Sequence, residues 1–200
     1  QDLRIINEAI IPLYPAVPNP YTLLSQIPEE AEWFTVLDLK DAFFCIPLHA
    51  DSQFLFDFED PTDHMFQLTW TVLPQGFRDS PHLFGQALAQ DLGQFSSPGT
   101  LVLQYMDDVF LAISLEASCQ QATLDLLNFL ANREYKVSRT KAQVCLQQVK
   151  YLGLVLAKEL EPLAKSYSAY TVISSPQNIE TVVGIPWNHW LLLTVDSWIQ

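Results

Sequence analysis

Three aspartates stand in apolar surroundings where their type and spacing could do metal chemistry. Asp107 and Asp108 are adjacent in LVLQYMDDVFLA, residues 101–112, and Asp38 interrupts the apolar run WFTVLDL. Aspartate is common in turns for structural reasons alone, because its side chain bonds nearby backbone groups. Here the flanking residues are so apolar that the turn must lie close to a core. Like charges in such a place raise each other's pKa and destabilise the fold unless a cation neutralises them.

The sequence around Asp38 offers no such cation along its own strand. Lys40 shares the parity of Asp38 but is expected to reach solvent beyond the strand end. If the strand of Asp38 lies beside the hairpin of Asp107, three carboxylates converge. An oxygen-only site of this kind favours Mg²⁺ over Zn²⁺, and could hold two ions roughly 3.5–4 Å apart for an in-line phosphoryl displacement. The predicted reaction class is nucleotidyl transfer.

The elements that must position these aspartates begin with a Pro-rich segment. We expect residues 1–30 to be an extended docking segment, followed by a buried strand through Asp38 that leads into a turn or short helix. QFLFDFED and HMFQLTWTVLP are predicted to pair as a hairpin around the EDPTD turn. Ser80 as N-cap and Pro81 at the first helical position predict a helix. Its inward face would hold Phe84, Leu88 and Leu92.

The second half of the chain continues with short strands and one more helix. LVLQY and VFLAI are predicted strands around the Met-Asp-Asp turn, and residues 116–134 a helix with Leu124, Leu127 and Leu130 inward. A basic loop, NREYKVSRTKAQ, leads to VCLQQVKYLGLVLA, a predicted strand pair. Because the order lacks βαβ regularity, the sequence indicates an α+β fold with an antiparallel sheet and helices on one face.

Composition narrows the class of protein further. Of 200 residues, 49% are hydrophobic, which is enough for a real core, and no run of 18 apolar residues predicts a membrane span. The N-terminus does not read as a signal peptide. Three widely spaced cysteines suit reduced thiols rather than a metal site. We therefore expect an intracellular protein, cytoplasmic or nuclear, that is neither secreted nor bound to a membrane.

The charge is unfavourable for simple electrostatic binding to nucleic acid. The net charge is −13, and only Arg4, Lys40 and Arg78 precede residue 133. The other seven basic residues lie between Arg133 and Lys165. Any grip on phosphates by this chain alone would rest on that patch.

Four motifs in order resemble those of reverse transcriptases of the gammaretrovirus-like class, which includes many endogenous retroviral polymerases. They are WFTVLDLKDAFFCIPLH, LTWTVLPQGFRDSPHLFGQAL, LQYMDDVFLA and SRTKAQVCLQQVKYLG, and they cover about residues 1–157. The resemblance implies a reverse transcriptase palm plus partial fingers. It implies an RNA-directed DNA polymerase that uses two Mg²⁺, or Mn²⁺ in their place. The implied partners are a template–primer of RNA or DNA and deoxynucleoside triphosphates.

The resemblance also implies roles for the catalytic positions. Asp38 and Asp107 would be the main metal ligands, and Asp108 would complete the triad less directly. Lys141 is a candidate proton donor to the leaving pyrophosphate, with a plain solvated lysine as the alternative. Phe43 would exclude a ribose 2′-OH by its bulk, with a plain core phenylalanine as the alternative.

Further positions are implied to contact the substrates. The backbone around Asp41 and Ala42 would cradle the triphosphate. Gln75 and Gly76 would contact the nucleotide and the template. Near the primer, the implied contacts are Tyr105 and Met106 at its terminus and Leu152 and Gly153 at the start of the primer grip.

Both ends of the chain depart from the resemblance. We expect most of the fingers to be missing before QDLRIINEAI, and after YLGLVLAKE the chain reads TVVGIPWNHWLLLTVDSWIQ instead of a thumb. Codons chosen for residues 185–190 give, in a shifted frame, Phe-Leu-Gly-Ile-Thr-Gly, which resembles the family's thumb–connection junction. We therefore predict partial fingers and palm over residues 1–157 and a frameshifted tail over residues 158–200, which the genomic DNA would test.

Three functions stay open at this point. The chain could be an active polymerase, a catalytically inactive relic of an endogenous retroviral gene, or a protein-interaction module. A partner protein, or further segments of the polyprotein, could supply the missing parts. Whether the chain itself is active, and in which oligomeric state, is not set by the sequence.

Overall fold

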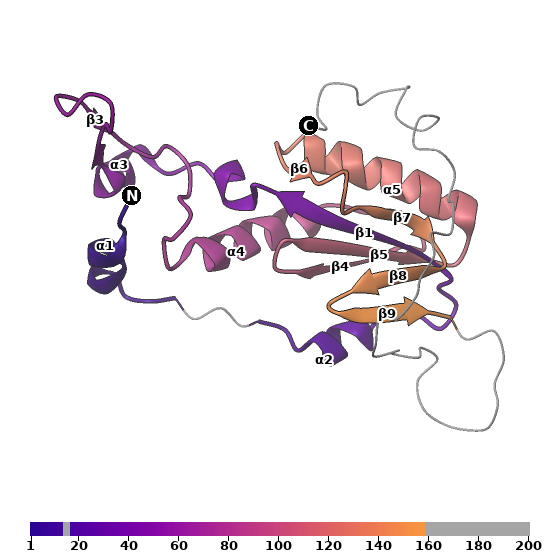
Figure 1. Cartoon of the computed structure of the whole chain (residues 1–200). Helices are drawn as coiled ribbons and strands as arrows, with labels where there is room; N and C mark the ends of the chain where they lie inside the picture. Colours follow the sequence, from indigo (N-terminus) through magenta and orange to yellow (C-terminus); the bar gives the residue numbers. More distant parts are fainter. Residues whose placement is uncertain (14–16, 159–200) are drawn as a thin grey trace. The chain divides into compact units, whose positions relative to one another are not determined.

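The computed structural model describes residues 1–13 and 17–158, which form two units (Figure 1). The first unit combines the N-terminal residues up to Val17 with residues 41–94. The second begins with Pro18–Lys40 and resumes at Phe95. Apart from Lys158, the predicted tail lies outside the described residues. Within the described ranges, no helix has the length and apolar character needed to cross a bilayer.

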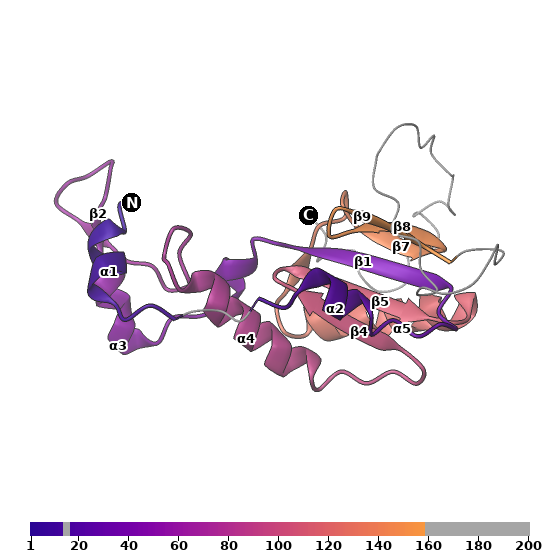
Figure 2. The same cartoon turned by 90° about the horizontal axis from the view of Figure 1, so that it is seen from below.

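The second unit is built on a five-stranded antiparallel sheet. Its strands are β1 (Trp33–Lys40), β4 (Leu101–Tyr105), β5 (Asp108–Ile113), β6 (Lys136–Val137) and β7 (Gln143–Leu146). The order is β4-β5-β1-β6, and β7 also pairs with β1. β4, β5 and β1 run side by side in both views (Figure 1; Figure 2). The antiparallel α+β prediction is confirmed, as are both predicted strands around the Met-Asp-Asp turn.

Helix α5 (Glu116–Ala131) covers one face of this sheet. Thr35 of β1 and Thr123 of α5 are fully buried and share a hydrogen bond of 2.8 Å between their hydroxyl oxygens. The buried face of the helix consists of Cys119, Ala122, Thr123, Leu126 and Leu130. The prediction of Leu130 is confirmed, whereas Leu124 and Leu127 are only half-buried. Leu126 and Leu130 share the buried face with Cys119 and Thr123, which contact Thr35.

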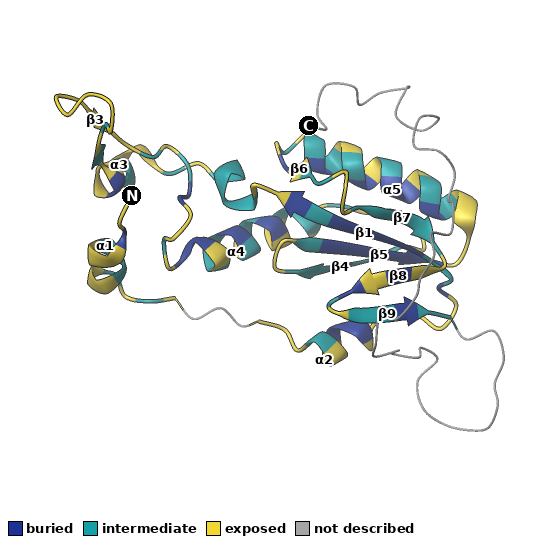
Figure 3. Cartoon of the chain, in the orientation of Figure 1, coloured by how far each residue is buried: buried dark blue, intermediate teal, exposed yellow. Residues whose placement is uncertain are grey.

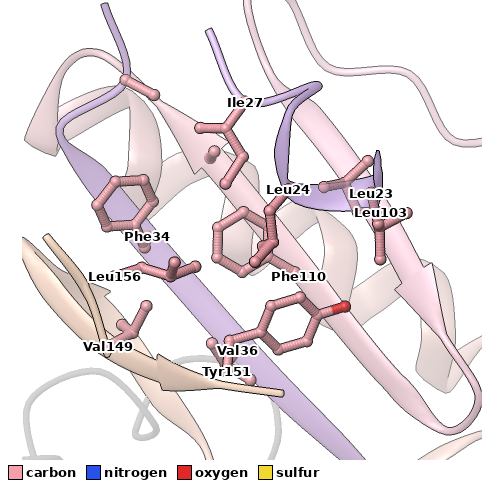
Figure 4. Packing of buried hydrophobic residues seen from close by; sticks show 12 residues of the cluster. Leu23, Leu24, Ile27, Phe34, Val36, Leu103, Phe110, Val149, Tyr151 and Leu156 are labelled. Atoms are coloured by element: carbon pink, nitrogen blue, oxygen red, sulfur yellow. The ribbon is translucent and has the colours of Figure 1, made fainter. Parts of the chain in front are cut away.

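Helix α2 (Pro20–Leu24) and the hairpin of β8 (Gln148–Tyr151) and β9 (Leu154–Ala157) cover the opposite face. Alternate residues of β1 point to it, because side chains alternate along a strand. Phe110 stacks on Phe34 at 5.8 Å and on Tyr151 at 4.9 Å between ring centroids (Figure 4). Burial of each such ring stabilises the fold by about 1.5–3 kcal/mol. This face carries the core cluster of the second unit.

The first unit consists of short elements. They are α1 (Arg4–Ala9), the 3₁₀ helix η1 (Ala42–Cys45), α3 (Ala50–Gln53), the 3₁₀ helix η2 (Phe54–Phe56), β2 (Phe58–Glu59), β3 (Gln67–Leu68) and α4 (Ser80–Leu92). The predicted hairpin is confirmed in a shorter form, as β2 paired with β3. Figure 3 shows that much of this hairpin region is exposed, whereas β1 and β5 of the second unit are largely buried.

Two predictions about helix starts are wrong. Residues 1–30 are not simply extended, because they contain α1 and α2. Helix α2 forms since the Asn19 side chain accepts a hydrogen bond from the Tyr21 N–H and Pro20 suits the first turn. At α4, Asp79 is the N-cap and Ser80 is already helical, its hydroxyl donating to the Pro74 carbonyl at 2.9 Å.

Candidate active site

Two of the three aspartates face each other across neighbouring strands of the second unit. In the antiparallel register of β1 and β5, Asp38 lies opposite Asp108. Asp107 precedes Asp108 in the loop, and its carbonyl accepts a hydrogen bond of 3.0 Å from the Leu39 N–H. Opposed residues in such a pair have Cα atoms about 4.5–5.5 Å apart. The strand of Asp38 thus lies beside the hairpin of Asp107, as predicted.

The loop that carries Asp107 is a tight two-residue turn. Tyr105 pairs with Asp108, which leaves Met106 and Asp107 as the loop. Met106 has φ of 54°, a conformation that costs a non-glycine residue on the order of 1–3 kcal/mol and persists where the surroundings impose it. The Gln104 side-chain amide donates to the Met106 carbonyl at 3.2 Å. Gln104 therefore helps to hold the turn, a role that our sequence analysis missed.

The apolar rows of the sheet lead directly into the carboxylates. Asp38 continues the row of Phe34 and Val36, and Asp108 continues that of Phe110 on the same face. Burial is the main cause that raises the pKa of Asp108 to about 6, followed by the charges of Asp107 and Asp38. The core that supports the strands therefore also withdraws water from Asp108.

Lys141 places its ammonium group beside Asp38. Its Nζ lies 3.0 Å from Asp38 Oδ2, and the Lys141 side chain is 67% exposed against 22% for Asp38. The contact with Asp38 raises the pKa of Lys141. The loop is tied to β1 by the Ser138 N–H, which donates to the Asp38 carbonyl at 2.8 Å. Lys40 is exposed, as predicted.

The side chains of Asp38, Asp107 and Asp108 are not arranged in the structure as the ligands of a bound metal ion. Within residues 1–13 and 17–158, no three His, Cys, Asp or Glu side chains are arranged to hold a metal ion as they stand. Their chemistry nevertheless suits a hard divalent cation, because all donors are carboxylate oxygens. Burial and the two neighbouring carboxylates raise the pKa of Asp108, and the charge of Lys141 opposes this only in part. An ion at Asp38 would compete with Lys141 for Oδ2.

The five residues predicted to bind the nucleotide belong to the first unit. Asp41 is exposed with φ of 53°, and Ala42 and Phe43 begin η1 directly after it. The half-buried Phe43 ring packs edge-to-face on Phe84 of α4, at 6.0 Å between centroids. Gln75 and Gly76 lie together in an exposed loop. Their approach to the carboxylates stays a prediction.

Asn7 of helix α1 holds the loop that contains Gly76 by hydrogen bonds. Gly76 has φ of 90°, which suits glycine and strains other residues. The Asn7 side-chain amide donates to the Gly76 carbonyl at 2.9 Å, and its oxygen accepts from the Arg78 N–H at 2.8 Å. Asn7 is thus another positioning residue that the sequence analysis missed. No pattern within residues 1–30 signals a contact so distant in the sequence.

The residues predicted at the primer lie in turns of the second unit. Tyr105 is half-buried against the core cluster, and Met106 is 42% exposed. Leu152 and Gly153 form the two-residue turn between β8 and β9, with φ of 53° and 75°. Two positive φ values are typical of a type I′ hairpin turn. Their role in holding a primer stays a prediction.

A comparison with known protein families shows the family to which the chain belongs. The family described as reverse transcriptase (RNA-dependent DNA polymerase) matches residues 1–156. The chain belongs to the reverse transcriptase family. Its type is gammaretroviral-like, because its relatives are Gag-Pol polyproteins of such viruses.

For three of these relatives, the matched share of this chain and of the whole polyprotein is as follows. The Gag-Pol polyprotein of Feline leukemia virus is 48% identical over 91% of this chain and 11% of its own length. That of Avian reticuloendotheliosis virus is 50% identical over 83% and 15%. That of Baboon endogenous virus (strain M7) is 47% identical over 93% and 10%. The chain thus spans roughly a tenth to a seventh of these polyproteins.

The extent of these matches bears on the C-terminal residues. Coverage of 93% is more than residues 1–157 of a 200-residue chain would give. The similarity therefore extends past residue 157. The point at which a tail unlike the family begins, and its frameshifted origin, stay predictions.

Solved structures share the fold of this chain. A foamy viral protease-reverse transcriptase in complex with double-stranded DNA has a TM-score of 0.66 at 24% identity, covering 78% of this chain and 26% of that one. Prototype Foamy Virus protease-reverse transcriptase has a TM-score of 0.63 at 27% identity, covering 84% and 21%. The predicted palm and fingers architecture is supported by both.

Proposed function

We propose that this chain supplies the carboxylate centre of an RNA-directed DNA polymerase, which adds deoxynucleotides to a primer 3′-OH. The observation that carries the proposal is the pairing of Asp38 with Asp108 across β1 and β5, with Asp107 in the adjoining turn. Burial and two neighbouring carboxylates raise the pKa of Asp108 to about 6, and this arrangement lowers the free energy of unfolding. Such arrangements cluster at functional sites.

Divalent metal is the cofactor that this centre would hold. We propose two Mg²⁺, replaceable by Mn²⁺, with Asp38 and Asp107 as main ligands and Asp108 completing the set. When bound, the ions would stabilise the attacking and leaving oxygens of the phosphoryl transfer. The chain's own part is to fix the carboxylates on a rigid hairpin and to keep water from Asp108.

Lys141 is proposed as the proton donor to the leaving pyrophosphate. Its ammonium group already lies at the carboxylates, 3.0 Å from Asp38 Oδ2, and the contact raises its pKa, so it carries a proton at neutral pH. An exposed side chain on a loop can also leave Asp38 when a metal ion replaces it there. The alternative of a lysine in solvent without a role is disfavoured by this contact.

The proposed substrates are a template–primer of RNA or DNA and deoxynucleoside triphosphates. The foamy viral relatives were solved in complex with double-stranded DNA and with an RNA/DNA hybrid, which supports nucleic acid as the partner here. Residues proposed to contact the nucleotide are Asp41, Ala42, Phe43, Gln75 and Gly76. Those proposed at the primer are Tyr105, Met106, Leu152 and Gly153.

Primer extension tests the proposed activity. Purified protein, an RNA template with a DNA primer, deoxynucleoside triphosphates and Mg²⁺ should give extension that Asp107→Asn abolishes. Asp125→Asn is the matched control, because Asp125 is an exposed aspartate on α5 away from the carboxylates. Extension that survives Asp107→Asn would refute the proposed role of the carboxylates.

Metal binding can be tested without catalysis. Titration with Mn²⁺, followed by electron paramagnetic resonance, should show bound ion in the wild type and in Asp125→Asn. Asp107→Asn should weaken binding by at least tenfold. Equal binding by all three proteins would refute the metal site, whatever the chain does with a primer.

A second candidate function, a protein-interaction surface, is favoured by exposed apolar side chains on the first unit. They are Ile5, Ile11, Leu13, Val17, Phe54, Leu55, Met65, Phe66 and Leu68. Large exposed apolar groups mark surfaces that pack against further protein. We propose that a partner, or further polyprotein segments, cover this unit. A purified chain that stays monomeric and binds no apolar dye would contradict this.

The proposed location is intracellular, cytoplasmic or nuclear. The three cysteines support it, because none is in a disulfide. Fractionation of cells expressing the tagged chain would test it, and recovery in the medium would contradict it.

A further inference from the structure

Two cysteines from distant parts of the chain meet inside the second unit. Cys119 of α5 and Cys145 of β7 lie against the same side chain, that of Thr35. Thr35 of β1 lies between them, its hydroxyl oxygen 3.8 Å from the Cys119 sulfur and 4.0 Å from the Cys145 sulfur. The Thr123 hydroxyl is 3.8 Å from the Cys145 sulfur. Neither thiol contributes to the carboxylate site.

The backbone at Cys145 is distorted in a way that supports this meeting. Its φ is 51°, and the pairing of β7 with β1 shifts register between Phe34 and Val36. The Cys145 N–H donates to the Thr35 hydroxyl at 3.1 Å, outside the regular ladder. A non-glycine residue keeps such a conformation only where its surroundings impose it. The bulge lets the Cys145 side chain reach Thr123 on α5.

The two thiols differ in exposure and acidity. Cys145 is half-buried and is the more exposed of the two, whereas Cys119 is fully buried. The hydrogen bond from Cys119 is the main cause that lowers the pKa of Cys145 to about 7, and the hydroxyls of Thr123 and Thr35 add to it. The same contact, with burial, raises the pKa of Cys119. An accessible thiolate beside a buried partner thiol is the arrangement of an attacking and a resolving cysteine.

We propose that Cys145 and Cys119 form a thiol–disulfide exchange site, which a small-molecule disulfide such as glutathione disulfide converts into an internal disulfide. The Cys145 thiolate attacks one sulfur of the reagent, forms a mixed disulfide and releases one thiolate. Cys119 then gives its proton to the released thiolate and attacks the Cys145 sulfur, which releases the second thiolate. Two protein thiols are oxidised, and one disulfide molecule is reduced to two thiols.

The new bond would tie α5 to β7 across the strand that carries Asp38. The two sulfurs, which both contact the Thr35 hydroxyl, would close to about 2.05 Å in the bond. Because the bond closes a loop of chain, the oxidised form should unfold at a higher temperature than the reduced form. A reductant should reverse the shift.

Oxidation of the folded protein tests the proposal directly. After treatment with glutathione disulfide at pH 8, two of the three thiols should be lost, and peptide mapping should show Cys119 joined to Cys145. Cys119→Ala should stop at the mixed disulfide and gain the mass of one glutathionyl group. Cys145→Ser should form no internal bond. Cys45→Ser is the control, since Cys45 lies in the first unit, and should behave as the wild type.

Two outcomes would overturn the proposal. One is a folded wild type that keeps all three thiols after this treatment. The other is a disulfide that involves Cys45, or that forms equally well in urea, where the fold no longer holds the two sulfurs together. Circular dichroism of each variant shows whether it is folded, and a comparison of Cys119→Ala with Cys119→Ser guards against failure of one substitution.

Discussion

Asp108→Asn is expected to stabilise the folded protein near neutral pH, although it removes a proposed site residue. Burial, then the charges of Asp107 and Asp38, raise the pKa of Asp108 from 3.8 to about 6. The folded protein therefore holds this proton more tightly than the unfolded chain. The free energy of unfolding consequently falls as the pH rises from about 4 to about 6 and stays at the lower value above that window.

The size of the effect follows from the same shift. A rise of about two pKa units corresponds to about 3 kcal/mol. Because Asp108 is only half-buried, solvent screening reduces this figure, and we expect about 1–2 kcal/mol. Asparagine keeps the shape of the side chain without the charge. The variant should therefore gain that amount at pH 7.5 and almost nothing at pH 4, where the wild-type carboxyl is already protonated.

Urea unfolding at the two pH values measures this difference. Wild type and Asp108→Asn are compared with Asp125→Asn, whose exposed carboxylate should give less than about 0.5 kcal/mol at either pH. A loss of stability in Asp108→Asn at pH 7.5 would refute the reasoning. So would a gain of the same size at pH 4, because it could not come from the charge.

Three further predictions concern the turn, the core and the lysine. Gly76→Ala should cost about 1–2 kcal/mol in urea unfolding, because φ of 90° strains alanine, while Gly85→Ala in α4 should gain about 0.5–1 kcal/mol because its Cβ meets open space. Equal effects would contradict this. Phe110→Ala should cost about 3–5 kcal/mol, since the ring is fully buried between two others. Lys141→Met should raise the pKa of Asp108 in a nuclear magnetic resonance titration, since the lysine charge lowers it, and an unchanged pKa would contradict that contact.

The sequence could predict the carboxylate centre because its geometry is local. A two-residue loop between β4 and β5 sets the position of Asp107 and Asp108, and apolar flanks on both sides of Asp38 indicate a buried strand. Antiparallel pairing of the two strands then brings the aspartates together. Which strand pairs with which was only a condition in the sequence analysis, and the pairing of β1 with β5 meets it.

The sequence could not predict contacts set by packing between distant segments. Lys141 reaches Asp38 across 103 positions, from a loop whose pattern is merely basic, so only the family resemblance pointed to Lys141. Asn7 and the Gly76 loop are a similar case. The buried face of α5 was misplaced for a related reason, because Leu124 and Leu127 are as large and apolar as the buried Leu126 and Leu130. The sheet presents Thr35 there, and a polar group selects Cys119 and Thr123 as neighbours.

The carboxylate site and the hydrophobic core of the second unit are in contact, so a substitution in the core can affect the site. Asp108 contributes to the raised pKa of Tyr151, whose hydroxyl is buried without a hydrogen-bond partner among the described residues. Tyr151 stacks on Phe110, two residues after Asp108 in β5. The aromatic stack that stabilises the sheet thus keeps water from the carboxylate. Core substitutions in β8 and β9 should therefore shift the affinity for a divalent cation, even though they touch no ligand.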